Sequence, residues 1–303
     1  MKAVVLNAYG DVNSLEFKNF PEPQIGANEI KVRMAGAGLN PIDWKLRSGA
    51  YKTMMPLELP TILGRDVSGT VVELGSGVTG FKVGDRVMGL VMGGYAELVV
   101  AATSAWAAVP SKMDLVDAAA LPLVLLTGSQ LIDEALQPKK GDVVLITGAL
   151  GGVGRTAVFA AKNRGATVWA AVRGSQMLEA GKLGAAGVVS LDDDADIARL
   201  PLLDGIADTV GGPTIAKLLT KVKPKGTIAS VVGEPAGAKA LGLVVRAIMT
   251  HADAAQLGTL AQAVADGRFV IPIATKFPLA EARAAQTLAA NHAGGKVLLT
   301  GSA

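Results

Sequence analysis

The chain of 303 residues contains no cysteine and only two histidines. The missing thiols exclude disulfide bonds, thiolate nucleophiles and zinc sites built from cysteine. His251 and His292 lie far apart in the sequence, and neither belongs to a pair at metal-binding spacing. No metal site is therefore expected.

Long apolar runs and blocks of like charge are also missing. The longest nearly apolar run, residues 118–126, is shorter than the roughly 18 residues that span a bilayer. The N-terminus turns polar at Asn7, before a signal-peptide core could form. The 29 basic and 26 acidic residues are spread evenly and leave no footprint for nucleic acid. We expect a cytoplasmic protein that binds neither membranes nor nucleic acid.

Aromatic residues make up only 4% of a chain that is half apolar, so the core must be built from Ala, Val, Leu and Ile, as is typical of α/β proteins. The length predicts about two domains. Residues 1–118 hold short, often alternating apolar runs separated by glycine, proline and asparagine, which indicates an all-β module.

Strands and helices alternate after a helical stretch at 118–136. We predict strands at 143–147, 167–172, 188–191, 206–210, 227–232 and 243–249, with helices at 152–164, 175–183, 213–222 and 253–266. This order predicts a doubly wound parallel sheet. The last block has a helix at 279–291 and a strand at 296–300, and it is expected to return to the first domain.

A glycine turn follows the apolar strand at 143–147 and opens a helix. Gly151 and Gly152 allow a sharp turn and a close approach to a pyrophosphate, while Gly154 lets the helix pack tightly on the strand. Gly148, Gly151, Gly152, Val153 and Gly154 are therefore predicted to bind a dinucleotide at the helix N-terminus.

The end of the second strand predicts which dinucleotide is used. NAD-binding folds place a carboxylate here for the ribose hydroxyls, whereas this chain has Arg173 and then Ser175. A guanidinium can grip a 2′-phosphate through charge-assisted hydrogen bonds, and a serine hydroxyl can add another donor. These residues favour NADPH. The alternative is that Arg173 is a solvated loop arginine.

Six segments carry a resemblance to a known family: Asn40-Pro-Ile-Asp-Trp-Lys-Leu-Arg-Ser-Gly49, Gly64-Arg-Asp-Val-Ser-Gly69, Val83-Gly-Asp-Arg-Val87, Gly93-Gly-Tyr-Ala-Glu97, the glycine turn, and Asp208-Thr-Val-Gly-Gly212. Over nearly its whole length the chain resembles the zinc-free medium-chain dehydrogenase/reductases, which include quinone oxidoreductases, enone reductases and enoyl-thioester reductases. The resemblance implies a GroES-like β-barrel substrate domain (1–118 and 268–303) and a Rossmann NADP-binding domain (119–267).

The resemblance also implies a reaction. Zinc-dependent relatives have a cysteine near the position of Asn40 and Gly-His-Glu in place of Gly64-Arg65-Asp66, so both metal positions are lost here. Without a Lewis acid, the expected reaction is hydride transfer from NADPH to a quinone or to the C=C bond of an α,β-unsaturated carbonyl compound. An enoyl-thioester reductase and a non-catalytic NADPH-binding protein are the alternatives.

Candidate catalytic residues follow from the same resemblance. Tyr51 corresponds to a tyrosine beside the nicotinamide and could supply a proton; alternatively it forms the pocket wall and solvent supplies the proton. Asn40 could orient the carboxamide or a substrate oxygen, or could be a turn residue before Pro41. Asp43 and Asp66 are interpreted as structural carboxylates. Which of Trp44 and Lys45 faces the site stays open.

The remaining expectations concern the nicotinamide half of the cofactor and the oligomer. Thr127 matches a family threonine near the nicotinamide phosphate; alternatively its hydroxyl bonds back to its own helix. Gly233 follows the fifth strand, where the nicotinamide ring should lie. Relatives dimerise through the strand that corresponds to 243–249, so a homodimer is expected.

Overall fold

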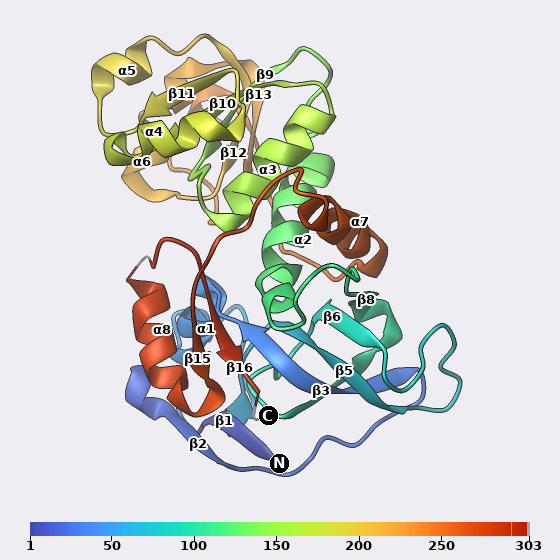
Figure 1. The fold of residues 1–303 in the computed structure, drawn as a ribbon. Helices are drawn as coiled ribbons and strands as arrows, with labels where there is room; N and C mark the ends of the chain where they lie inside the picture. Colours follow the sequence, from blue (N-terminus) through green and yellow to red (C-terminus); the bar gives the residue numbers. More distant parts are fainter. Residues whose placement is uncertain (292, 302–303) are drawn as a thin grey trace. The chain divides into compact units, whose positions relative to one another are not determined.

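The computed structural model describes residues 1–291 and 293–301, so His292 lies outside the described part of the chain. Two compact units are present: Met1–Leu123 with Ala252–Ala303, called unit 1 here, and Val124–His251, called unit 2. Figure 1 shows their elements. These boundaries differ from the sequence-derived ones, because helix α7 (Ala254–Ala265) packs on strand β8 (Trp106–Ala108) and so belongs to unit 1.

Unit 2 is built on one six-stranded sheet. Its strands are β9 (Val143–Thr147), β10 (Thr167–Val172), β11 (Gly187–Ser190), β12 (Leu203–Asp208), β13 (Val222–Ser230) and β14 (Val244–Ala247). The spatial order is β11-β10-β9-β12-β13-β14, and every neighbouring pair is parallel. This is the doubly wound Rossmann order, as predicted.

Helices connect these strands and cover the sheet. They are α3 (Gly152–Asn163), η5 (Gly174–Gln176), α4 (Met177–Ala180), η6 (Gly181–Leu183), α5 (Asp194–Ala198), α6 (Gly212–Ala216), η7 (Leu219–Lys221) and η8 (Lys239–Leu241). Helix α3 buries Gly154, Ala157, Val158 and Ala161, which share one face at helical spacing. That face packs toward β9 and β10. The helix predicted at 213–222 is instead split into α6 and η7.

The apolar helical stretch Asp117–Leu136 comprises η3 (Asp117–Ala120), α2 (Pro122–Gln130) and the π-helical η4 (Leu131–Leu136). By length and composition alone it could cross a membrane, although its longest apolar run had indicated otherwise. However, 83% of its most apolar window is buried inside the structure, as in the core helix of a globular protein.

Unit 1 contains two sheets. The larger has the order β15-β16-β3-β5-β6-β8, with β7 also paired to β3, and the smaller has the order β2-β1-β4. The strands are β1 (Lys2–Leu6), β2 (Leu15–Asn19), β3 (Glu29–Gly38), β4 (Thr61–Ile62), β5 (Asp66–Leu74), β6 (Arg86–Leu90), β7 (Leu98–Ala102), β8, β15 (Ile273–Pro278) and β16 (Lys296–Thr300). Strand β16 pairs antiparallel with β3, so the end of the chain completes a sheet begun near its start.

Helices also occur in unit 1, both before residue 118, where the sequence had indicated only strands, and in its C-terminal part, where helices at 253–266 and 279–291 were predicted. They are η1 (Val12–Ser14), α1 (Pro41–Arg47), η2 (Thr103–Ala105), η3, α7, η9 (Leu279–Glu281) and α8 (Ala282–Ala290). The all-β prediction was wrong for α1, which has clear helix-start signals. Asn40 is its N-cap, Pro41 is the first helical residue, and the Asp43 carboxylate accepts the Asn40 backbone N–H.

Candidate cofactor and catalytic site

The glycine turn between β9 and α3 is too tight for side chains. Gly148 has φ +61°, in the left-handed region. A Cβ added at Gly154 would overlap the Gly148 carbonyl oxygen, and one added at Gly152 would lie 2.8 Å from a Val124 methyl carbon. The N-cap, Gly151, has no side-chain capping bond, so no cap side chain occupies the first amides of α3. These amides and the open backbone fit the pyrophosphate of a dinucleotide.

A buried carboxylate ties the neighbouring strand ends to this turn. Asp208 at the end of β12 accepts hydrogen bonds from the Thr147 hydroxyl (2.8 Å) and from the backbone N–H of Val210 (3.1 Å) and Gly211 (3.0 Å). The Thr209 hydroxyl donates to the Thr147 carbonyl oxygen at 2.7 Å. Residues 208–212 form one of the segments that resemble the family, but the sequence did not predict a role in the site for any of them.

This bracing places apolar surface beside the glycine turn. A Cβ added at Gly148 would lie 3.0 Å from a Val210 methyl carbon, and Val210 is 47% exposed. Val232, two residues beyond the end of β13, is 37% exposed. Exposed apolar side chains at the carboxyl edge of a doubly wound sheet suit the flat rings of a dinucleotide.

Arg173 and Ser175 follow the end of β10, and both are exposed. Within the residues that the structure describes, the Arg173 guanidinium makes no hydrogen bond or ion pair, so it is available to a ligand. Between the two residues, the Gly174 N–H donates to the Asp192 carboxylate at 2.8 Å. Asp192, just beyond β11, therefore brings a negative charge to the position predicted to hold a 2′-phosphate.

Thr127 and Gly233 were assigned to the nicotinamide half of the cofactor. The Thr127 side chain is nearly buried, and its hydroxyl lies 2.7 Å from that of Thr250 rather than bonding back to its own helix. Gly233 has φ +104°, and an added Cβ there would meet no atom within 4 Å. Their contacts with a cofactor stay predictions.

In unit 1, a buried ammonium joins Asn40, near which zinc-dependent relatives have a cysteine, to Asp66, which stands where they have the Glu of Gly-His-Glu. The Lys296 Nζ donates to the Asn40 side-chain oxygen (2.7 Å), the Asp66 carboxylate (3.0 Å) and the Leu39 carbonyl oxygen (3.0 Å). The Asn40 side-chain nitrogen donates to the same Asp66 oxygen at 2.8 Å. Both amide atoms of Asn40 are thus engaged inside the protein, and its role in orienting a ligand stays a prediction.

A second buried carboxylate anchors helix α1. Asp43 accepts hydrogen bonds from the Tyr95 hydroxyl (2.7 Å) and the Asn40 backbone N–H (2.8 Å), both at Oδ2, while its Oδ1 has no partner within the described residues. Burial raises the pKa of Asp43 to about 6, although the Tyr95 hydrogen bond acts against the shift. Burial also raises the pKa of Tyr95 well above its ordinary value. This closed environment fits the structural role expected of Asp43.

Tyr51 is half-buried, and its hydroxyl is bonded to a cation. The Lys45 Nζ donates to the Tyr51 hydroxyl oxygen at 3.2 Å and lies 5.3 Å from the centre of its ring. Of the two neighbours that the sequence left open, Lys45 is therefore the one that bonds Tyr51. Because α1 was not predicted, the sequence gave no reason to pair these residues.

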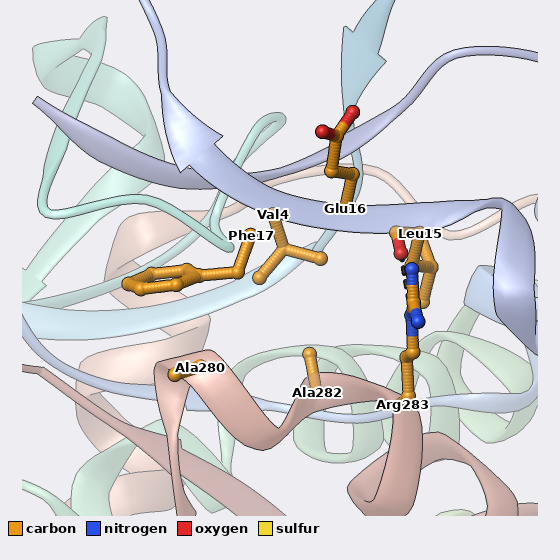
Figure 2. Close-up of a pocket in the computed structure, with 7 residues that line it drawn as sticks. All are labelled: Val4, Leu15, Glu16, Phe17, Ala280, Ala282 and Arg283. Atoms are coloured by element: carbon orange, nitrogen blue, oxygen red, sulfur yellow. Dashed lines mark hydrogen bonds between the residues drawn. The ribbon is translucent and has the colours of Figure 1, made fainter.

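A cavity of about 280 Å³ lies elsewhere in unit 1 (Figure 2). Phe17 and Arg283 flank it, with Val4 and Ala282 between them. The Arg283 guanidinium is already bonded to the backbone carbonyl oxygens of Leu15 (2.6 Å) and Asn13 (3.2 Å). None of the predicted site residues lines this cavity, so we do not assign the chemistry to it.

Comparisons with known proteins match both units. Residues 26–111 match the alcohol dehydrogenase GroES-like domain, and residues 183–299 match the zinc-binding dehydrogenase family. A quinone oxidoreductase of Pseudomonas aeruginosa is 32% identical, over 98% of this chain and 99% of that protein. The chain belongs to the quinone oxidoreductase branch of the medium-chain dehydrogenase/reductase superfamily.

A solved structure and two further relatives agree with this membership. The quinone oxidoreductase from Coxiella burnetii superposes with a TM-score of 0.90 at 31% identity, over 99% of both chains. A 2-methylene-furan-3-one reductase of Solanum lycopersicum is 33% identical, over 77% of this chain and 62% of that protein. A chloroplast envelope quinone oxidoreductase homolog of Arabidopsis thaliana is 37% identical, but the match spans only 55% of that protein.

Membership in this branch agrees with the residues of the site. Reductases of the superfamily use a nicotinamide cofactor, and the glycine turn fits one. Although one matching family is named for zinc, the chain has no cysteine, and its described residues contain no group of three or more His, Asp or Glu that could hold a metal. This donor set is consistent with the zinc-free branch.

Proposed function

We propose that this protein is an NADPH-dependent reductase that transfers hydride to quinones or to the C=C bond of α,β-unsaturated carbonyl compounds. The full-length similarity to a quinone oxidoreductase supports the reaction class, and the tomato relative named as a 2-methylene-furan-3-one reductase supports the enone arm. The free guanidinium of Arg173 beside Ser175 supports NADPH over NADH.

The buried Lys296 ammonium supports the proposed class of hydride acceptor. It is bonded to Asn40, near which metal-dependent relatives have a cysteine, and to Asp66, which corresponds by resemblance to the Glu of their Gly-His-Glu segment. A fixed ammonium there fills the coordinating capacity of both side chains and offers no open position for a substrate oxygen. Conjugated C=C bonds and quinones suit such a site, because their own carbonyl groups accept the electron pair that the hydride displaces.

The proposed mechanism divides the work among the chain's residues. The first amides of α3 bind the pyrophosphate, while Arg173 and Ser175 bind the 2′-phosphate. Thr127 and Gly233 border the nicotinamide half. A bound NADPH supplies the hydride from nicotinamide C4. Tyr51 then donates its hydroxyl proton to the oxygen of the enolate.

An acceptor panel tests the function. Purified protein with NADPH is offered quinones, enones, enals and enoyl thioesters while the absorbance of NADPH is followed. We expect turnover of quinones or enones, and no turnover of any acceptor would refute the proposal. Faster turnover of enoyl thioesters than of free enones would move the protein to the enoyl-thioester reductases.

The choice of cofactor has its own test. Arg173→Ala should weaken NADPH binding more than about tenfold, because charge-assisted hydrogen bonds to a phosphate are lost, and should leave NADH binding nearly unchanged. Binding is measured by the fluorescence of the reduced nicotinamide. Equal affinities of the wild type for NADH and NADPH would contradict the role given to Arg173.

We also propose a homodimer formed through β14. This strand is at the edge of the six-stranded sheet, and Val244 is 40% exposed there. An exposed apolar edge strand can pair with a second copy. Light scattering coupled to size-exclusion chromatography should give twice the chain mass, and Val245→Pro should give the monomer mass. A monomeric wild type would refute the dimer.

A further inference from the structure

The Lys45 ammonium contacts a phenol and no carboxylate. Its Nζ is 3.2 Å from the Tyr51 hydroxyl oxygen, and within the described residues it forms no ion pair with any Asp or Glu. Lys45 is half-buried as well, so water solvates its charge only in part. The charge is therefore directed at Tyr51.

The direction of this hydrogen bond fixes what the phenol can do. An ammonium has three donors and no acceptor, so the Tyr51 oxygen must be the acceptor. The phenol's own hydrogen is then left to donate elsewhere. Across residues 1–291 and 293–301, no side chain or backbone group accepts it. The Tyr51 O–H is thus held ready for a ligand oxygen.

Helix α1 fixes the position of Lys45. Asp43 and Arg47 are one turn apart on α1, and both bind the interior of unit 1: Asp43 accepts from Tyr95 at 2.7 Å, and Arg47 donates to Gln286 at 2.7 Å. Each helical residue turns by about 100°, so Lys45 projects from the face opposite these anchors. The chain reverses after α1 at Gly49 and brings Tyr51 back to Lys45.

We propose that Lys45 is a positioning residue for the Tyr51 hydroxyl in the reduction of α,β-unsaturated carbonyl compounds, an inference that rests on the proposed function. As the hydride forms a C–H bond at the β-carbon, the π electrons of the C=C bond move to the carbonyl and give an enolate. The Tyr51 O–H bond breaks, and its proton forms an O–H bond on the enolate oxygen. Lys45 stabilises the phenolate left on Tyr51, which regains a proton from water.

A pair of lysine variants tests this role. Lys45→Met removes the ammonium and keeps the length of the stem. Lys52→Met is the matched control, because Lys52 adjoins Tyr51 in sequence but is exposed, and its ammonium makes no hydrogen bond or ion pair within the described residues. These two variants are assayed together with Lys45→Arg and Tyr51→Phe. Each assay uses NADPH with an enone that the wild type reduces, and then with a quinone.

We expect Lys45→Met to lower kcat on the enone about tenfold to a hundredfold, within the range attributed to one general acid, with KM for NADPH unchanged. The loss should be smaller on a quinone, whose oxygen is already a good electron sink. Lys45→Arg should restore most of the rate, because arginine keeps a cation and a donor. Lys52→Met should behave like the wild type.

The double variant separates positioning from a general structural effect. In a Tyr51→Phe background, Lys45→Met should change kcat less than about twofold, because its partner is already absent. An equal loss in both backgrounds, or no loss in either, would overturn the role of Lys45 while the reductase proposal stood. A wild type without turnover on any acceptor would instead refute the proposed function and this role with it.

Discussion

The raised pKa of Asp43 predicts how the stability of the protein depends on pH. Asp43 is fully buried, and its pKa is about 6, against an ordinary value of 3.8. The folded state therefore binds this proton more tightly than the unfolded state does. The contribution of Asp43 to stability is greatest below pH 3.8, falls as the pH rises from 3.8 to about 6, and is constant at higher pH. A shift of about two pH units corresponds to roughly 3 kcal/mol.

Replacing Asp43 by asparagine removes this dependence. In Asp43→Asn the amide oxygen can accept the two hydrogen bonds now made to Oδ2, while the amide nitrogen takes the place of Oδ1, which has no partner. The unpaired nitrogen costs about 1–3 kcal/mol at every pH. The difference in unfolding free energy between variant and wild type should therefore shift by about 2–3 kcal/mol in favour of the variant between pH 4 and pH 7.

Urea unfolding at several pH values measures this difference, followed by tryptophan fluorescence because Trp106 is buried in unit 1. Glu58→Gln is the control, since Glu58 is exposed in the same unit. The difference in unfolding free energy between Glu58→Gln and the wild type should stay constant with pH. A difference between Asp43→Asn and wild type that stays constant with pH, or moves in the opposite direction, would refute the assignment of this titration to Asp43.

Three more predictions concern the glycine turn, the buried Lys296 ammonium and the Asp192 carboxylate. Gly154→Ala should weaken NADPH binding at least tenfold in a fluorescence titration, because its Cβ would overlap the Gly148 carbonyl oxygen; Gly181→Ala, with open space around its added carbon, should bind normally. Lys296→Met should lower stability by about 3–5 kcal/mol in urea unfolding, since Asp66 would stay buried without its cation, and adding Asp66→Asn should recover part of the loss. Asp192→Asn should tighten NADPH binding about fivefold without affecting NADH, which corresponds to the roughly 1 kcal/mol of one exposed charge pair; unchanged NADPH affinity would mean that Asp192 does not face the phosphate.

The strands of unit 2 overlap the predicted ones, because strands such as β9 and β10 are short, largely buried apolar runs between glycine and polar breaks. Unit 1 was harder. Strand β2 has one fully buried residue among exposed or half-buried ones, and β15 only alternates half-buried and exposed residues before it ends at a proline, so both bury few side chains. The seven residues of α1 lay inside a segment interpreted as β structure, and their caps were not recognised.

The site shows the same division between local and long-range information. The glycine turn could be predicted because one continuous segment forms it. The bond from Lys296 to Asn40 joins residues 256 positions apart, and nothing local distinguishes this lysine among 29 basic residues. Only the placement of β16 beside β3 brings them together. The Asp192 carboxylate likewise lies beside the Arg173 segment only because β10 pairs with β11.

The position of β16 inside its sheet affects the order in which a growing chain can fold. All six strands of unit 2 have been synthesised before residue 252, whereas β16 follows them and must enter between β15 and β3. Until Lys296 arrives, Asp66 and Asn40 lack the cation that they enclose. On the ribosome, the middle of this chain can therefore complete its sheet first, while the N-terminal strands wait for the last one.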